Sequence, residues 1–90
     1  MNEQLIEEIR ARLSTALKPI DLEITDESHK HIGHAGAKSG KGHFHVRIIS
    51  AQFHDLSQVR RHRLIYTAVG NLMDTDIHAL SIAATSPDEA

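Results

Sequence analysis

Residues 44–48 read Phe-His-Val-Arg-Ile, so apolar and polar side chains alternate along this stretch. A period of two is typical of a half-buried β-strand, and the pattern continues to about residue 50. Because alternate side chains of a strand point to opposite faces, we expect His43, His45 and Arg47 on its outward side.

A second strand is predicted upstream, over residues 20–25, where Ile20, Leu22 and Ile24 alternate with polar residues. The long segment 26–42 separates the two strands and holds four glycines, three lysines and three histidines without any periodicity. A structureless segment of this length is usually functional or flexible in a small domain. We therefore predict an antiparallel strand pair joined by a flexible loop.

Helical periodicity flanks the strand pair on both sides. Residues 3–17 carry apolar side chains at helical spacing, with Asn2 as N-cap, and Pro19 ends this helix. Ser57 can cap a second helix that runs to about Met73, although Gly70 weakens or divides it. The side chains expected to face inward from this second helix are Val59, Ile65, Ala68, Val69 and Leu72.

A last strand is predicted over residues 77–84, after turn residues 74–76, with His78, Leu80 and Ile82 on one face. Residues 85–90 are expected to be a frayed tail. The order helix, strand, strand, helix, strand predicts a small α+β domain in which two helices cover one face of a three-stranded sheet.

Length and composition limit the functional classes. Ninety residues predict a single domain, residues 1–90, with a small core and little room for an enclosed active site. No apolar run approaches the ~20 residues that span a bilayer, and no secretory signal is predicted, so we expect no membrane association. The chain has no cysteine and therefore no thiolate of its own, which fits a reducing, cytoplasmic location.

Charge is distributed unevenly, although the net charge is only −2. Residues 29–63 contain seven of the eight histidines and a single acidic residue, Asp55. The seven basic residues of this stretch are Lys30, Lys38, Lys41, Arg47, Arg60, Arg61 and Arg63. The sequence therefore predicts one basic, histidine-rich side, for which a solvated face of mixed charge is the alternative interpretation.

Several motifs, in order and at consistent spacing, resemble the BolA family over roughly residues 3–84. They are Asp26-Glu27-Ser28-x-x-His31-x-Gly33-His34-Ala35-Gly36, Gly42-His43-Phe44, Phe53-x-x-x-Ser57-x-x-x-Arg61-His62-Arg63-x-Ile65-Tyr66 and Ile77-His78-Ala79-Leu80-Ser81-Ile82. One departure is Asp55, where the family often has glycine; aspartate tolerates the turn geometry that this position needs.

The resemblance implies a type II KH-like fold with a three-stranded mixed sheet and helices on one face. It also implies a non-enzymatic adaptor whose partner is a CGFS-type monothiol glutaredoxin, with a bridging 2Fe–2S cluster that glutathione helps to ligate. His78 matches the family ligand that begins the last strand, and His31 matches the loop ligand. Imidazole can replace thiolate on one iron of such a cluster. No cofactor is expected on the isolated chain.

Other interpretations stay open. His29 and His34 are alternative loop ligands, and the three loop histidines could instead carry zinc, nickel or copper. A transcriptional regulator of the BolA type would bind DNA, and either DNA or a partner protein could dock on a basic surface formed by Arg60, Arg61, His62, Arg63, Lys41 and Arg47. A pI near 6.4 argues against DNA. The sequence leaves homodimerisation undecided, and no spacing supports a catalytic set.

Overall fold

The computed structural model describes residues 3–28 and 42–90. Within these residues, three helices and a short 3-10 helix accompany three strands, in the order α1, β1, β2, η2, α3, α4, β3. Their bounds are α1 Glu3–Leu17, β1 Asp21–Asp26, β2 Gly42–Ile49, η2 Ala51–Phe53, α3 Gln58–Val69, α4 Leu72–Thr75 and β3 Ile77–Thr85.

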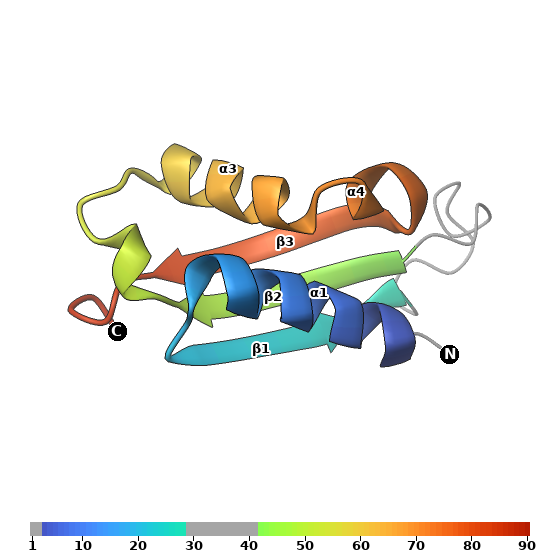
Figure 1. Ribbon diagram of the computed structural model, residues 1–90, viewed down its shortest axis with the longest axis horizontal. Coiled ribbons are helices and arrows are strands. Elements are labelled where there is room, and N and C mark those ends of the chain that lie inside the picture. Colours follow the sequence, from blue (N-terminus) through green and yellow to red (C-terminus); the bar gives the residue numbers. More distant parts are fainter. Residues whose placement is uncertain (1–2, 29–41) are drawn as a thin grey trace.

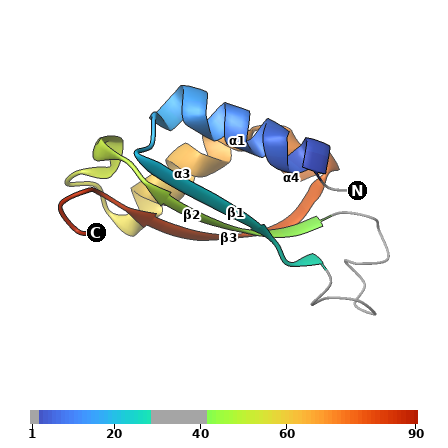
Figure 2. The same cartoon turned by 90° about the horizontal axis from the view of Figure 1, so that it is seen from below.

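The strands form one mixed sheet in the order β1-β2-β3. β1 pairs with β2 antiparallel, with Ile24 opposite Val46, and β2 pairs with β3 in parallel. Figure 2 shows α1 and α3 on the same side of this sheet, and none of the described helices on its opposite face. The α+β class, the strand pair and the helices on one face are therefore confirmed.

The core lies between the helices and the sheet. Its buried apolar side chains come from every long element: Ile9, Leu13, Leu17, Ile24, Phe44, Val46, Ile48, Phe53, Ile65, Val69, Leu72, Ile77, Leu80 and Ala84. The four-residue spacing of Ile9, Leu13 and Leu17 places all three on one face of α1. The helix ends there because Lys18 adopts a positive φ of 46° directly before Pro19.

Two predicted signals around α3 are confirmed. The Ser57 side chain accepts a hydrogen bond from the Arg60 backbone N–H at 3.2 Å and so caps the helix. Gly70 divides the predicted long helix into α3 and α4, and its φ of 57° is one that side-chain-bearing residues rarely adopt. The predicted turn at residues 74–76 begins inside α4, a single helical turn.

Two apolar residues differ from the sequence-based expectation. Val59 was expected to face the core but is 60% exposed. Ile20 was expected to begin the first strand, yet it precedes β1 and is 70% exposed. In both cases the spacing of apolar residues in the sequence predicts an inward side chain, but no other part of the described structure packs over Val59 or Ile20.

The C-terminal residues are held in place instead of forming the expected frayed tail. Ser86 is 1% exposed, and its hydroxyl donates to Oδ1 of Asp88 at 2.5 Å. The backbone N–H of Glu89 donates to the Ser86 carbonyl at 3.0 Å, which closes a turn. Figure 1 shows this C-terminal turn and the N-terminus at opposite ends of the long axis of the molecule.

Candidate functional site

His78, the predicted cluster ligand, lies in a β-bulge at the start of β3. Gly42 pairs with Ile77, whereas His43 pairs with Ala79, so that His78 is an extra residue in β3. A bulge disrupts the alternation of side chains and re-aims the inserted residue. The expectation that His78 shares a face with Leu80 is therefore wrong: Leu80 is buried, whereas His78 is exposed.

The imidazole of His78 lies against a second imidazole that the sequence analysis assigned to the outward surface. The ring centroids of His43 and His78 are 4.9 Å apart, with the rings tilted by 54°. His43 is only 8% exposed, and both of its ring nitrogens are buried. His43 alternates with the buried Phe44 as predicted, but it is not solvent-exposed, and its ring lies beside that of His78.

Hydrogen bonds of the His43 backbone hold the start of β2 against the residues that follow β1. The His43 N–H donates to Oγ of Ser28 at 3.0 Å, and the Glu27 N–H donates to the His43 carbonyl at 2.8 Å. Oδ1 of Asp26 in turn accepts from the Ser28 N–H at 2.9 Å. Ser28 and Gly42, which flank residues 29–41 in the chain, are thus both at the His78 end of the sheet.

Glycine at position 42 makes this junction possible. A Cβ atom there would lie 2.4 Å from Cε2 of Phe44, whose side chain is 1% exposed. The Gly42 N–H donates to the Asp76 carbonyl at 3.0 Å, which holds the chain close to the residue before β3. Gly42 therefore allows β2 to begin directly beside the His78 bulge.

The loop ligand candidates His31, His29 and His34, and the basic residue Lys41, lie outside the described residues. Within residues 3–28 and 42–90, no three histidine or acidic side chains come together in a group that could hold a metal ion. His78 therefore has the accessible imidazole that a ligand needs, but the described part of the chain cannot complete a metal site around it.

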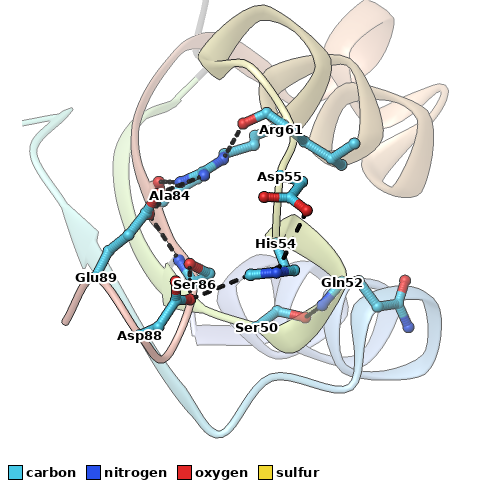
Figure 3. Close-up of polar contacts among 10 residues, drawn as sticks. Ser50, Gln52, His54, Asp55, Arg61, Ala84, Ser86, Asp88 and Glu89 are labelled. Carbon is cyan, nitrogen blue, oxygen red and sulfur yellow. Dashed lines mark hydrogen bonds and ion pairs between the residues drawn. The ribbon is translucent and has the colours of Figure 1, made fainter.

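The structure removes Arg61 from the predicted basic surface, because its guanidinium is directed at Glu89 (Figure 3). Arg61 is 3% exposed, and its guanidinium binds both carboxylate oxygens of Glu89, at 2.5 and 2.8 Å. The same guanidinium donates to the carbonyls of Leu56 and Ala84 at 2.9 and 3.0 Å. Arg61 therefore belongs to the interior, and its expected place on a docking surface is wrong.

This ion pair shifts the acid–base behaviour of both partners. The hydrogen bond from Arg61 lowers the pKa of Glu89 to about 2, and the bond from Glu89 raises the pKa of Arg61. Glu89 was not predicted as a partner of Arg61, because 28 positions separate the two residues in the sequence. An acidic residue in an expected tail carries no sequence signal for such a distant contact.

The other predicted basic residues differ in whether their charges are free to contact a partner. Arg47 is paired with Asp21 at 2.8 Å and with Glu23 at 3.4 Å, and the bond to Asp21 raises its pKa. Arg60 and Arg63 are exposed on α3, and His62 is half-buried between them in the sequence. The basic surface that the structure describes is therefore reduced to the outer side of α3.

Comparisons with known proteins agree with this architecture. The profile of the BolA-like protein family matches residues 13–89. The chain is 41% identical over 85 residues to the chloroplastic Protein BOLA1 of Arabidopsis thaliana, covering 91% of this chain and 53% of that protein. It is 42% identical over 86 residues to SufE-like protein 1 of the same plant, covering 90% of this chain and 23% of that protein.

The chain therefore spans about half, or less, of the length of these two relatives. A solved structure, the BolA domain of SufE1 from Arabidopsis thaliana, superposes with a TM-score of 0.85 at 39% identity and covers 100% of this chain and 99% of that domain. In residues 3–28 and 42–90, no helix combines the length and apolar character needed to cross a membrane. The chain belongs to the BolA-like protein family.

Proposed function

We propose that this chain is a non-enzymatic adaptor that binds a monothiol glutaredoxin and co-ligates a bridging 2Fe–2S cluster through His78 and His31. The observation that carries the proposal is the exposed imidazole of His78, held in a bulge against the buried ring of His43. A metal-ligating histidine needs a fixed ring orientation, which supporting contacts provide. Packing against His43 reduces the ring orientations available to His78.

The strand directions also support a second ligand from the segment between β1 and β2. Ser28 and Gly42, the residues on either side of that segment, lie at the His78 end of the sheet. His31 follows Ser28 by three positions in the sequence. Because the chain has no cysteine, its own contribution consists of imidazoles, and the glutaredoxin cysteine and glutathione would supply the thiolates.

The test is anaerobic mixing with a cluster-loaded monothiol glutaredoxin, followed by visible circular dichroism. We expect wild type to change the spectrum, His78→Ala to abolish the change, and His31→Ala to decide the loop ligand. His54→Ala is the matched control, because His54 is an exposed histidine that binds Asp88 at the C-terminal turn. A spectrum that changes equally with wild type and His78→Ala rules out His78 as a ligand.

A DNA-binding regulator is the second candidate, and the exposure of Arg60 and Arg63 favours it. KH domains hold backbone phosphates with a GxxG loop between two helices. At the junction of α3 and α4 this chain reads Gly70-Asn71-Leu72-Met73, of which the last two residues already belong to α4, and glycine stands only at the first position. Among the described residues of the predicted basic surface, Arg61 and Arg47 are engaged in ion pairs, which leaves Arg60 and Arg63 as the arginines for phosphates. DNA affinity that falls steeply with added salt is the expected signature of this function.

A histidine-loop metal carrier would rest on His29, His31 and His34, and tight zinc binding by the isolated chain would favour it over the adaptor. We also propose a reducing compartment such as the cytoplasm, since a cysteine-free chain needs no oxidising environment. The Arabidopsis relatives are chloroplastic, and one of them is also mitochondrial.

A further inference from the structure

β3 is an edge strand of the sheet, with β2 as its neighbour on one side. The Thr85 carbonyl accepts from the Ser50 N–H at 3.0 Å, so the backbone groups of Thr85 face β2. Successive residues of a strand direct their N–H and C=O groups to opposite sides. The N–H and C=O groups of Leu80, Ile82 and Ala84 therefore point away from β2, along the free edge.

This edge lacks the usual protection against pairing with another chain. Edge strands are commonly blunted by charged side chains, proline or short length. β3 is nine residues long and reads Ile-His-Ala-Leu-Ser-Ile-Ala-Ala-Thr, with no lysine, arginine, acidic residue or proline. The opposite edge strand, β1, is six residues long and contains Asp21, Glu23 and Asp26. The two edges of the sheet are therefore protected unequally.

Side chains of α3 occupy only part of the β3 edge. At the C-terminal end, the Ala84 carbonyl accepts from Arg61 at 3.0 Å and from Gln58 at 3.4 Å. Further along, the Tyr66 hydroxyl donates to the Leu80 carbonyl at 3.5 Å, which is the limit of a hydrogen bond. No described residue reaches the outward backbone groups of Ile82. The open part of the edge is centred on Ile82.

An apolar and cationic helix face lies beside this open part. Val59, Arg63 and Tyr66 are spaced by four and three positions, which places them on one side of α3. The Tyr66–Leu80 contact shows that this side borders β3. Val59 and Tyr66 are 60% and 40% exposed, although both are large and apolar. Arg63 is exposed and has no ion-pair partner among the described carboxylates.

We propose that the edge of β3 from Ala79 to Ala83 binds an extended segment of a partner protein, which adds a fourth strand to the sheet. The outward N–H and C=O groups of Leu80 and Ile82 would supply the backbone pairing, as in other cases of strand addition. An apolar side chain of the segment packs on Val59 and Tyr66, and an acidic one pairs with Arg63. The partner segment is thus extended, apolar and acidic.

A second copy of this chain fits the surface less well. Arg63 lies between Gln58, which reaches Ala84, and Tyr66, which reaches Leu80. A two-fold pairing of β3 with β3 centred on Ile82 would therefore bring the two copies of Arg63 together. Like charges placed opposite each other oppose such pairing, whereas an acidic segment neutralises Arg63. This surface requires no cluster, so its test is independent of the proposed glutaredoxin function.

The test uses the isotope-labelled, cluster-free chain and a seven-residue peptide of alternating valine and glutamate with blocked ends. We expect the backbone amide NMR signals of Leu80 and Ile82 to shift as the peptide is added, and their hydrogen exchange to slow. The control peptide has the same sequence with alternate backbone nitrogens methylated, so that it cannot pair with a strand edge. It should leave these signals unchanged.

Variants of the chain separate backbone pairing from charge. Arg63→Glu should weaken binding about two- to fivefold, the effect of losing one exposed ion pair, whereas Lys18→Glu makes the same charge change beside the opposite edge and should not. Ile82→Pro removes an outward N–H at an edge position that tolerates proline, and should abolish binding while far-UV circular dichroism stays native. If Ile82→Pro misfolds, Val59→Glu tests the same surface from α3, because it removes the apolar contact and repels the acidic peptide, and it should weaken binding.

Four results would overturn the proposal. The first is the absence of amide shifts in Leu80 and Ile82 at about 1 mM peptide, in the affinity range of weak binding. The second is equal binding of the methylated peptide. The third is concentration-dependent dimerisation through β3, which would assign the edge to a second copy. The fourth is displacement of the peptide by single-stranded DNA with a steep salt dependence, which would assign the surface to nucleic acid.

Discussion

Replacing Gly42 with alanine should destabilise the domain, because the added methyl group collides with a core side chain. The Cβ atom would lie 2.4 Å from Cε2 and 2.7 Å from Cζ of Phe44. Non-bonded carbon atoms normally approach to about 3.5–4.0 Å, so the ring or the backbone must move by about 1 Å. Phe44 is 1% exposed and is packed among other core side chains, which leaves its ring no space to move into.

The size of the effect follows from two opposing contributions. Forcing an extra methyl group into a well-packed core costs about 1–3 kcal/mol. Alanine also restricts the unfolded chain relative to glycine, which offsets about 0.4–1 kcal/mol of that cost. The free energy of unfolding should therefore fall by about 1–2 kcal/mol, which lowers the Tm of a domain of this size by roughly 4–16 °C.

Thermal denaturation followed by far-UV circular dichroism measures this change in wild type, Gly42→Ala, Phe44→Leu and the double variant. Leucine at position 44 makes room for the methyl group, so Phe44→Leu should cost less in the Gly42→Ala background than in wild type. A coupling of about 0.5 kcal/mol or more between the two sites is expected for residues in direct contact. An unchanged Tm for Gly42→Ala, or strictly additive effects, would refute the steric explanation.

Variants at three further positions test other parts of the structure. Because the pKa of Glu89 falls from 4.5 to about 2 on binding Arg61, its contribution to stability is present above pH 4.5 and is lost as the pH falls towards 2. Urea denaturation should therefore show Glu89→Gln less stable than wild type at pH 6, with the two converging near pH 2; a constant difference contradicts the ion pair. Asp55 has a φ of 62°, which valine disfavours and glycine tolerates. The free energy of unfolding of Asp55→Gly should therefore stay within about 0.5 kcal/mol of wild type, whereas that of Asp55→Val should fall by about 1–2 kcal/mol. Equal stability of both variants rejects the strain argument. The buried Ser50 hydroxyl donates to the Leu17 carbonyl at 2.6 Å, so Ser50→Ala should cost about 1–3 kcal/mol in the same assay; a neutral effect would mean that water satisfies that carbonyl.

The elements of the fold could be predicted because their signals are local. Alternation over a few residues identifies β2, and a cap at Ser57 with a break at Gly70 defines α3. The tolerance of Asp55 for turn geometry is also a local property, and its positive φ confirms it. Each of these features depends on residues only a few positions apart, so the sequence alone reveals it.

The parts of the site that differ from prediction depend on contacts between distant segments. The His78 bulge arises from the pairing of β3 with β2, so alternation within residues 77–84 alone cannot reveal it. Arg61 reads as a surface cation in the sequence, yet Glu89 draws it into the interior from 28 positions away. His43 is buried beside His78, although the strand pattern directs it outward. The sequence thus identified His78 as a candidate but not its surroundings.

Strand direction explains why the proposed ligand His78 and the Arg61–Glu89 ion pair lie at opposite ends of the sheet. Because β2 and β3 are parallel and β1 is antiparallel to β2, Asp26, Gly42 and Ile77 all lie at one end. Any ligand from the segment between β1 and β2 therefore starts from the His78 end. The Arg61–Glu89 pair lies beside Ala84, near the last residue of β3.

This separation has a consequence for function. Glu89→Gln should lower stability at neutral pH yet leave the spectral change with a cluster-loaded glutaredoxin intact, because its effect on the sheet is confined to the Ala84 end. His78→Ala should abolish the spectral change yet leave the stability at neutral pH close to that of wild type, since the exposed His78 ring contributes little to the core. Loss of the spectral change in folded Glu89→Gln would mean that the two ends of β3 are coupled, and the assignment of ligation to the His78 end alone would then be wrong.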